Sequence, residues 1–192
     1  MRSKHDNAFL GLVQPWVVSP PAEVVSTRMF TLKSRRARSP VSGKEGVFDY
    51  LDAPDWAHVA AITPDQRVVM IEQFRHGTGE VTLELPGGCI DEGESPAEAC
   101  ARELLEETGY AGEQVEIIGR VSSNPALMNN HTFTGLVVNA VPSSGQNLDA
   151  TEEIGVRLVP LAEVPSLIRA GVIHHSLVVA GFHYLALRFG HC

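Results

Sequence analysis

The sequence predicts an α+β protein with mixed sheets, because β-type runs fill most of the chain and helical signals are confined to two regions. The β-type runs extend from about residue 16 to residue 159, with clusters of turn residues between them. The helical signals lie at 95–108 and beyond residue 160. A chain of 192 residues is near the usual length of one domain and can bury a core without disulfides.

The N-terminal region, residues 1–52, is expected to form a loose polar tail followed by antiparallel β-structure. A strand is predicted at 24–32, a turn containing Pro and Gly at 39–46, and a partner strand at 47–51. The basic run at 33–38 interrupts this pattern. We interpret it as the solvated end of a hairpin, the alternative being a binding patch.

The remaining residues, 53–192, are expected to form the main domain. Apolar runs at 59–62 and 68–74 flank a Thr-Pro-Asp-Gln turn signal, which predicts two connected strands. Further strands are predicted at 81–85, 115–121, 131–141 and 155–159. The segment 142–147 is predicted to be a loop within the domain, because β-type patterning resumes directly after it.

The first helix has clear boundary signals. Residues 95–98 read Ser-Pro-Ala-Glu, a capping box with proline at the first helical position. The helix should run to about Thr108 and end at Gly109, since glycine is the usual residue after a helix end. Two further helices are predicted at 161–170 and 176–189.

Charge and composition exclude several classes of protein. A net charge of −8 argues against broad binding to nucleic acid, which needs a basic surface. The three cysteines lack metal-type spacing, which favours a reducing compartment. The start of the chain has no apolar signal-peptide core, and no apolar run approaches the roughly 18 residues of a membrane span. We therefore expect a cytoplasmic protein that binds neither nucleic acid nor membrane.

The most informative stretch is the helix at 95–108 together with the Gly-Gly turn before it. Glu103 and Glu107 are four residues apart and therefore share a helix face, with Glu106 beside them. Like charges at this spacing destabilise a helix by roughly 0.2–0.5 kcal/mol per pair. Either a bound cation compensates them or the face is a solvated acidic surface. All-oxygen ligands favour hard ions such as magnesium, manganese or calcium.

The spacing of these residues matches the Nudix box, G-x5-E-x7-R-E-U-x-E-E-x-G-U, where U is a bulky aliphatic residue. Every fixed position agrees: Gly88, Glu94, Arg102, Glu103, Glu106, Glu107 and Gly109. Leu104 suits the first U, whereas Tyr110 departs from an aliphatic residue at the last, which is a packing position. The chain therefore resembles the Nudix hydrolases over residues 88–110.

The resemblance implies a Nudix fold, in which a mixed β-sheet is sandwiched between helices (α/β/α) and the box forms a loop–helix–loop. It also implies a divalent ion, Mg²⁺ or Mn²⁺, bound by Glu103, Glu106, Glu107 and the Gly87 carbonyl. The residues that would support the box are Gly88, Glu94, Arg102 and Gly109. The implied reaction is attack of water on phosphorus, assisted by ions that neutralise a diphosphate and activate the water.

Residues that flank the box resemble the branch acting on ADP-ribose and related nucleoside diphosphate sugars. They include Glu-Gln-Phe-Arg, which ends at Arg75, Leu-Glu-Leu-Pro before the glycines, and the downstream Pro125. Arg75 is a candidate diphosphate or sugar clamp, because guanidinium matches phosphate, or else a partner of a surface acid. Glu84 is a candidate contact near the metals or a solvated strand end. Asn129 and Asn130 are candidates to bind sugar hydroxyls or only to form a turn.

The catalytic base is expected in the acidic loop before the strand at 155–159. Glu153 is placed slightly ahead of Glu152, and an exposed acidic turn is the alternative. Glu106 would take part in catalysis by sharing the metals. In the branch that the chain resembles, N-terminal strands build a homodimer and help to form the nucleobase pocket. Trp16 would stack there or pack inside the protein.

The expected activity is metal-dependent hydrolysis of the diphosphate bond of a nucleoside diphosphate sugar such as ADP-ribose. The products would be a nucleoside monophosphate and a sugar phosphate. Two alternatives stay open. The chain is either a Nudix hydrolase of nucleoside triphosphates or dinucleoside polyphosphates, or a sensor that binds ADP-ribose without cutting it.

Overall fold

The computed structural model describes residues 11–190, so most of the tail expected at the N-terminus lies outside the described residues. The chain forms two compact units. In the described range, the first unit comprises residues 11–53 and 124–129, and the second comprises residues 54–123 and 130–190. No helix in the described part of the chain is long and apolar enough to cross a membrane.

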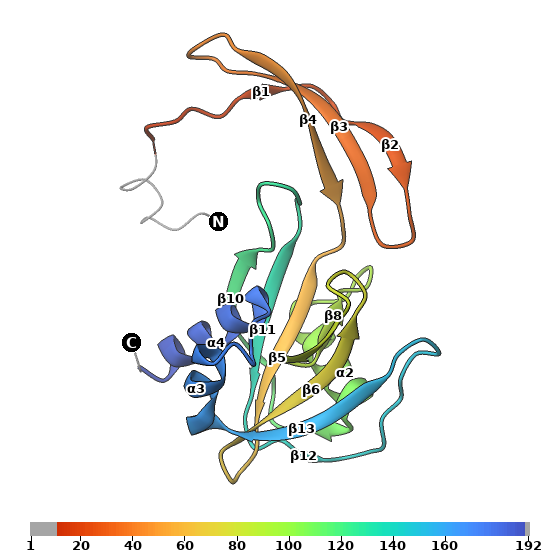
Figure 1. The fold of residues 1–192 in the computed structure, drawn as a ribbon, viewed down its shortest axis with the longest axis vertical. Helices are drawn as coiled ribbons and strands as arrows, with labels where there is room; N and C mark the ends of the chain where they lie inside the picture. The colour runs from red at the N-terminus through yellow and green to blue at the C-terminus, as the bar shows by residue number, and fades with distance from the viewer. Residues whose placement is uncertain (1–10, 191–192) are drawn as a thin grey trace. The chain divides into compact units, whose positions relative to one another are not determined.

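The first unit is an antiparallel sheet built around β3 (Figure 1). One edge of β3 pairs with β4, and the other pairs with β1 and β2 in succession. The bounds are β1 Val17–Val18, β2 Ala22–Ser26, β3 Thr31–Arg38 and β4 Glu45–Asp52. The segment 124–129 packs with this unit: the Leu51 N–H donates to the Leu127 carbonyl at 2.8 Å.

The prediction of one continuous strand at 24–32 is wrong, because the chain turns between β2 and β3. The Thr27 hydroxyl closes the turn by accepting hydrogen bonds from the backbone N–H groups of Met29 and Phe30 at 3.2 and 3.1 Å. Threonine hydroxyls often form local bonds of this kind and so compete with the strand ladder.

The basic run at 33–38 belongs to β3 itself and is not the end of a hairpin. Its side chains have partners on the neighbouring strand β4. The Arg35 guanidinium lies 5.0 Å from the centre of the Tyr50 ring, and Lys33 forms an ion pair with Asp52. Cross-strand pairs of this type stabilise a strand whose composition alone suggests a solvated loop.

The second unit contains a seven-stranded mixed sheet with the order β10-β11-β5-β6-β13. In addition, β7 pairs with the end of β6 and β8 with the start of β5. Only the β11–β5 pair is parallel in this sheet of the described chain. The bounds are β5 Trp56–Ile62, β6 Arg67–Arg75, β7 Glu80–Glu84, β8 Gly87–Cys89, β10 Glu116–Ser122, β11 His131–Val137 and β13 Ile154–Pro160.

Two predicted elements are divided in the structure. The strand predicted at 131–141 ends with β11, because Asn139 adopts a left-handed backbone with φ of 55°. A short β12 then pairs with β9. The helix predicted at 161–170 is a 3₁₀ turn followed by α3. The bounds are β9 Tyr110–Ala111, β12 Val141–Pro142, η1 Leu161–Glu163, α2 Pro96–Thr108, α3 Val164–Arg169 and α4 Ser176–Arg188.

Helices cover both faces of this sheet (Figure 1). Alternating strand residues form two cores, one under each set of helices. Ala60 and Met70 pack with Phe182 of α4, whereas Val59 and Val69 pack with Leu104 of α2. These cores show that apolar residues of β5 and β6 point to opposite faces in turn. The α+β class and the helix–sheet–helix arrangement predicted from the sequence are therefore confirmed.

Helix α2 begins and ends where the sequence predicts. The Ser95 hydroxyl accepts from the Glu98 N–H at 3.3 Å, and the Glu98 carboxylate accepts from the Ser95 N–H at 2.8 Å. At the other end, Gly109 adopts φ of 72° and its N–H donates to the Leu105 carbonyl at 2.8 Å. Both ends are set by local chemistry, so the helix that carries the box glutamates has a defined register.

Ser95→Ala should lower the free energy of unfolding by about 1 kcal/mol, because the Glu98 N–H loses its acceptor. The expected fall in Tm is about 2–4 °C for a chain of this size. Ser95→Asp serves as the control, since aspartate is an equally good cap and should keep the Tm of the wild type. Thermal unfolding followed by circular dichroism makes the comparison, and equal Tm values for all three proteins would contradict it.

Candidate active site

Glu107 is the most deeply buried of the box glutamates, with 3% of its surface exposed. Its Oε2 accepts a hydrogen bond from the Gly87 N–H at 2.8 Å, which joins α2 to β8. Burial raises the pKa of the Glu107 carboxyl to about 8, although the bond from Gly87 acts in the opposite direction. A carboxylate held in such a place gains from a nearby positive charge.

Glu103 faces the Gly-Gly turn from the same side of α2. A Cβ atom at Gly88 would overlap the Glu103 carboxylate, so a larger residue there would force this side chain to move. Burial raises the pKa of Glu103, while its hydrogen bond from Arg102 opposes the increase. Two neighbouring carboxyls with raised pKa values indicate that burial disfavours their charged forms more than the surrounding hydrogen bonds favour them.

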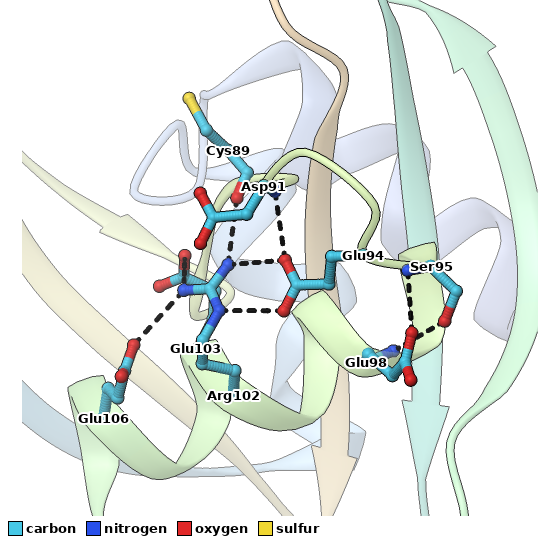
Figure 2. Close-up of polar contacts among 8 residues, drawn as sticks. All are labelled: Cys89, Asp91, Glu94, Ser95, Glu98, Arg102, Glu103 and Glu106. Carbon is cyan, nitrogen blue, oxygen red and sulfur yellow. Dashed lines mark hydrogen bonds and ion pairs between the residues drawn. The ribbon is translucent and has the colours of Figure 1, made fainter.

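Arg102 lies among the carboxylates of the box (Figure 2). Its Nε and Nη2 donate to the two oxygens of Glu94, both at 2.9 Å, and Nη2 also donates to the Cys89 carbonyl at 3.0 Å. Its Nη1 donates to Glu103 at 2.7 Å and to Glu106 at 3.2 Å. The structure thus brings together Glu94 and Arg102, and the guanidinium joins the box loop to the helix.

Because Arg102 draws Glu103 and Glu106 toward itself, the carboxylates do not converge on one point. Among residues 11–190, no group of three or more His, Cys, Asp or Glu side chains has the geometry of an ion-binding cluster. The donors nevertheless suit a divalent ion: they are all oxygens, they share one helix face, and Gly88 leaves space beside them. Glu106 is more exposed than Glu103, and a change of its rotamer can bring its oxygens toward the other donors.

A cavity of about 140 Å³ lies beside these glutamates. The acidic loop after β12 forms its other wall. Glu152 lines the cavity, whereas Glu153 is not among the described residues that line it. The Glu152 carboxylate also accepts from the Asp149 N–H at 3.1 Å. The lining residues are Arg102, Glu103, Glu106, Glu107, Asn147, Leu148, Asp149 and Glu152.

Arg75 and Glu84 form a bidentate pair between β6 and β7. Arg75 Nε and Nη2 donate to the two Glu84 oxygens at 2.7 and 2.8 Å. Glu84 is only 2% exposed; its burial would raise the pKa, but hydrogen bonds from Arg75 and Thr82 outweigh burial and lower it. The Arg75 guanidinium also lies 5.8 Å from the centre of a Trp56 ring.

This arrangement leaves Arg75 partly exposed beside a buried carboxylate, rather than paired with a surface acid. Sequence analysis identified Arg75 and Glu84 separately but did not identify Trp56 or Thr82. Glu84 pairs with Ile71 and Thr82 pairs with Gln73 across β6 and β7. The strand register decides which residues of β6 and β7 lie opposite each other, and no motif in the sequence gives this register.

The two asparagines proposed as sugar contacts are engaged in internal hydrogen bonds. Asn129 donates to Asp52 at 2.5 Å and accepts from the Ala53 N–H at 3.3 Å. Asn130 is buried, and its amide nitrogen donates to the Pro54 carbonyl at 2.9 Å. These contacts tie both side chains to residues 52–54, while the buried Asn130 Oδ1 has no hydrogen-bond partner among the described residues. Sugar binding by either asparagine stays a prediction.

Carboxylates on one helix face, opposite an acidic loop and beside a glycine turn, define a site suited to cation-assisted chemistry on phosphates. A family model described as NUDIX domain matches residues 54–180, and the chain therefore belongs to the Nudix family. It is a Nudix pyrophosphohydrolase. Relatives named as an ADP-ribose pyrophosphatase and an ADP-sugar pyrophosphatase support the predicted branch.

Two relatives and one solved structure illustrate the similarity. The chain is 26% identical over 149 residues to an ADP-ribose pyrophosphatase from Bacillus subtilis, covering 77% of this chain and 80% of that protein. It is 48% identical over 62 residues to an ADP-sugar pyrophosphatase from Mus musculus, covering 32% and 28%. The crystal structure of an ADP compounds hydrolase has a TM-score of 0.81 and 22% identity, over 95% of this chain and 100% of that one. This last likeness shows the fold.

Glu107→Gln should change how the stability of the metal-free protein depends on pH. The folded pKa of Glu107 is about 8 and lies above its ordinary value of 4.5, so the folded state binds the proton more tightly. Its contribution is complete below the unfolded pKa and is lost as the pH rises through about 8. In excess EDTA, wild-type Tm should fall between about pH 5 and pH 9 more steeply than the variant's.

The difference between the two curves of Tm against pH isolates the contribution of Glu107, because all other titrating groups are common to both proteins. At about pH 9 the variant should be the more stable by about 2–8 °C. Thermal scans across the pH range measure this, and parallel curves for the two proteins would show that Glu107 is not protonated preferentially in the folded state.

Proposed function

We propose that this protein hydrolyses the diphosphate bond of a nucleoside diphosphate sugar such as ADP-ribose, with Mg²⁺ as the ion. The products are a nucleoside monophosphate and a sugar phosphate. The observation that carries the proposal is the cavity where three box glutamates of α2 face Glu152 of the acidic loop. The names of the relatives, an ADP-ribose pyrophosphatase and an ADP-sugar pyrophosphatase, support the class of substrate.

The chain's own residues divide the work. Glu103, Glu106, Glu107 and the Gly87 carbonyl would hold the ion, and Mn²⁺ has the same preference for oxygen ligands. When bound, such ions neutralise a diphosphate and lower the pKa of a bound water. Glu94 and Arg102 keep the box loop against α2 through the two hydrogen bonds between their side chains.

Glu152 is the residue we propose as the general base. It lines the cavity opposite α2, whereas Glu153, which the sequence analysis placed slightly ahead, is not among the described lining residues. A base must reach the attacking water by a hydrogen bond once the substrate is bound. In the proposed step, Glu152 accepts a proton from water, and the resulting hydroxide adds to phosphorus as the bridging oxygen leaves with the departing phosphate.

Arg75 is the proposed contact for the diphosphate. The Glu84 carboxylate accepts from Nε and Nη2 of Arg75, so the Nη1 hydrogens of Arg75 take no part in this ion pair. A guanidinium fixed in this way offers a preorganised cation to phosphate oxygens. Glu84 acts by orienting Arg75 and does not itself contact the anionic substrate.

The first unit supplies a candidate pocket for the nucleobase of the substrate. A cavity of about 500 Å³ there is lined by Trp16, Arg35, Phe48, Tyr50 and residues 125–129, among others. Trp16 and Phe48 meet edge to face with ring centres 5.6 Å apart. Aromatic faces of this kind stack on nucleobases. Exposed valines on this sheet, Val17, Val24, Val25 and Val47, support a homodimer, and a cytoplasmic location remains part of the proposal.

Phosphate release in a coupled phosphatase assay tests the proposal. The panel comprises ADP-ribose, ADP-glucose, GDP-mannose, UDP-glucose, a diadenosine polyphosphate and nucleoside triphosphates, each with Mg²⁺ and with EDTA. A nucleotide sugar should turn over only with the ion. Glu152→Gln should lower kcat by about 10²–10⁴-fold, the usual effect of losing a general base.

Glu153→Gln is the matched control, because it removes a neighbouring carboxylate outside the cavity lining. It should keep the turnover of the wild type. Turnover of triphosphates alone would refute the proposed substrate class. Binding of ADP-ribose without product would identify a sensor, and a loss confined to Glu153→Gln would reverse the assignment of the base.

A further inference from the structure

The acidic loop, residues 143–153, is fastened to the C-terminal end of α2. The last carbonyls of a helix lack partners within the helix and need donors from elsewhere. Here the N–H groups of Ser143 and Ser144 donate to the Gly109 carbonyl at 2.8 and 3.0 Å. The Asn147 N–H donates to the Glu106 carbonyl at 2.8 Å. The loop that forms one wall of the cavity is thus attached to the helix that forms the other.

Gln146 supplies the side-chain part of this attachment. Its Nε2 donates to the Glu107 carbonyl at 2.6 Å and to the Ile154 carbonyl at 3.2 Å. Both partners are acceptors, so the amide nitrogen, and not the amide oxygen, must face them. One amide group therefore links the last turn of α2 to the first residue of β13.

The two hydrogen bonds of the Gln146 amide lie at the two ends of the segment that carries Glu152. The segment leaves the helix end at Asn147, turns where the Glu152 N–H donates to the Asp149 carbonyl at 2.9 Å, and enters β13 at Ile154. Gln146 bonds to the backbone at both ends of this path. Its amide group therefore bridges the two ends of the segment that carries Glu152.

We propose that Gln146 is a positioning residue that holds Glu152 at its working distance from the α2 glutamates; this inference rests on the proposed function. Gln146 is not among the described residues that line the cavity, so it acts through Glu152 and not on substrate. Much of Gln146 is exposed, and it packs in neither hydrophobic core. Its loss should therefore change the geometry of the loop more than the stability of the fold.

Gln146→Met tests the proposal, because methionine keeps the length of the side chain and removes both donors. The expected loss in kcat is about 10–100-fold, the usual effect of releasing a group that orients an active-site residue. KM, the Mg²⁺ concentration for half-maximal rate and the Tm should stay near wild type. Ser144→Ala is the control, since its exposed hydroxyl donates to the neighbouring Gly145 carbonyl and to no other group of residues 11–190.

A double-mutant cycle separates positioning from a general effect on the loop. If Gln146 acts through Glu152, then Gln146→Met should cause no further loss in a Glu152→Gln background. Losses that multiply would overturn the proposal, as would wild-type kcat in Gln146→Met or an equal loss in Ser144→Ala. A rise in KM with unchanged kcat would also overturn it.

Amide hydrogen exchange gives a readout that does not depend on turnover. Residues 147–153 should exchange faster in Gln146→Met than in the wild type, and unchanged exchange would overturn the proposal. If the wild type hydrolyses no nucleotide sugar, the proposed function and the positioning role fail together. If the wild type is active and the Met variant matches it in rate and exchange, only the inference about Gln146 fails.

Discussion

The second unit is organised around one contact, the hydrogen bond from the Gly87 N–H to the buried Glu107 carboxylate. It joins the box helix to a strand that pairs with β5. A Cβ at Gly87 would overlap the backbone at Ala57 and His58, so glycine is required for this pairing. Together these constraints put the end of α2, and with it the glutamates, at a fixed place on the sheet.

The placement of these glutamates at the sheet lowers the stability of the folded protein. Burying Glu107 and Glu103 raises the pKa of each carboxyl, because the charged form loses water and meets like charge. Arg102 compensates part of the charge, and its own pKa rises because Glu94 accepts its hydrogen bonds. A fold that gathers acids against their electrostatic preference is typical of a site that binds a cation or transfers protons.

The box helix was predictable because its signals are local. The Ser95 cap, the proline after it and Gly109 act within a few residues, and the bounds Pro96–Thr108 follow from them. The glutamate face follows from the helical period alone. By contrast, the turn at Thr27 depends on one hydroxyl inside a β-rich run, which periodicity does not detect.

The rest of the site depends on contacts between distant segments. The choice between Glu152 and Glu153 is a matter of loop geometry, since adjacent residues in one acidic run carry the same sequence signal. The Arg75–Glu84 pair depends on strand register, and the Gln146 link joins two elements through backbone carbonyls that any sequence possesses. Such contacts leave no motif, so the structure is needed to identify them.

The central claim is that the α2 glutamates and the Gly88 turn together hold a divalent ion. Binding of Mn²⁺, measured by the electron paramagnetic resonance of the free ion, tests it most directly. Gly88→Ala should weaken binding by about tenfold or more, because its Cβ displaces the Glu103 carboxylate. Gly77→Ala, whose Cβ meets no atom within 4 Å, should bind as the wild type does. Equal affinity in wild type and Gly88→Ala would contradict the account.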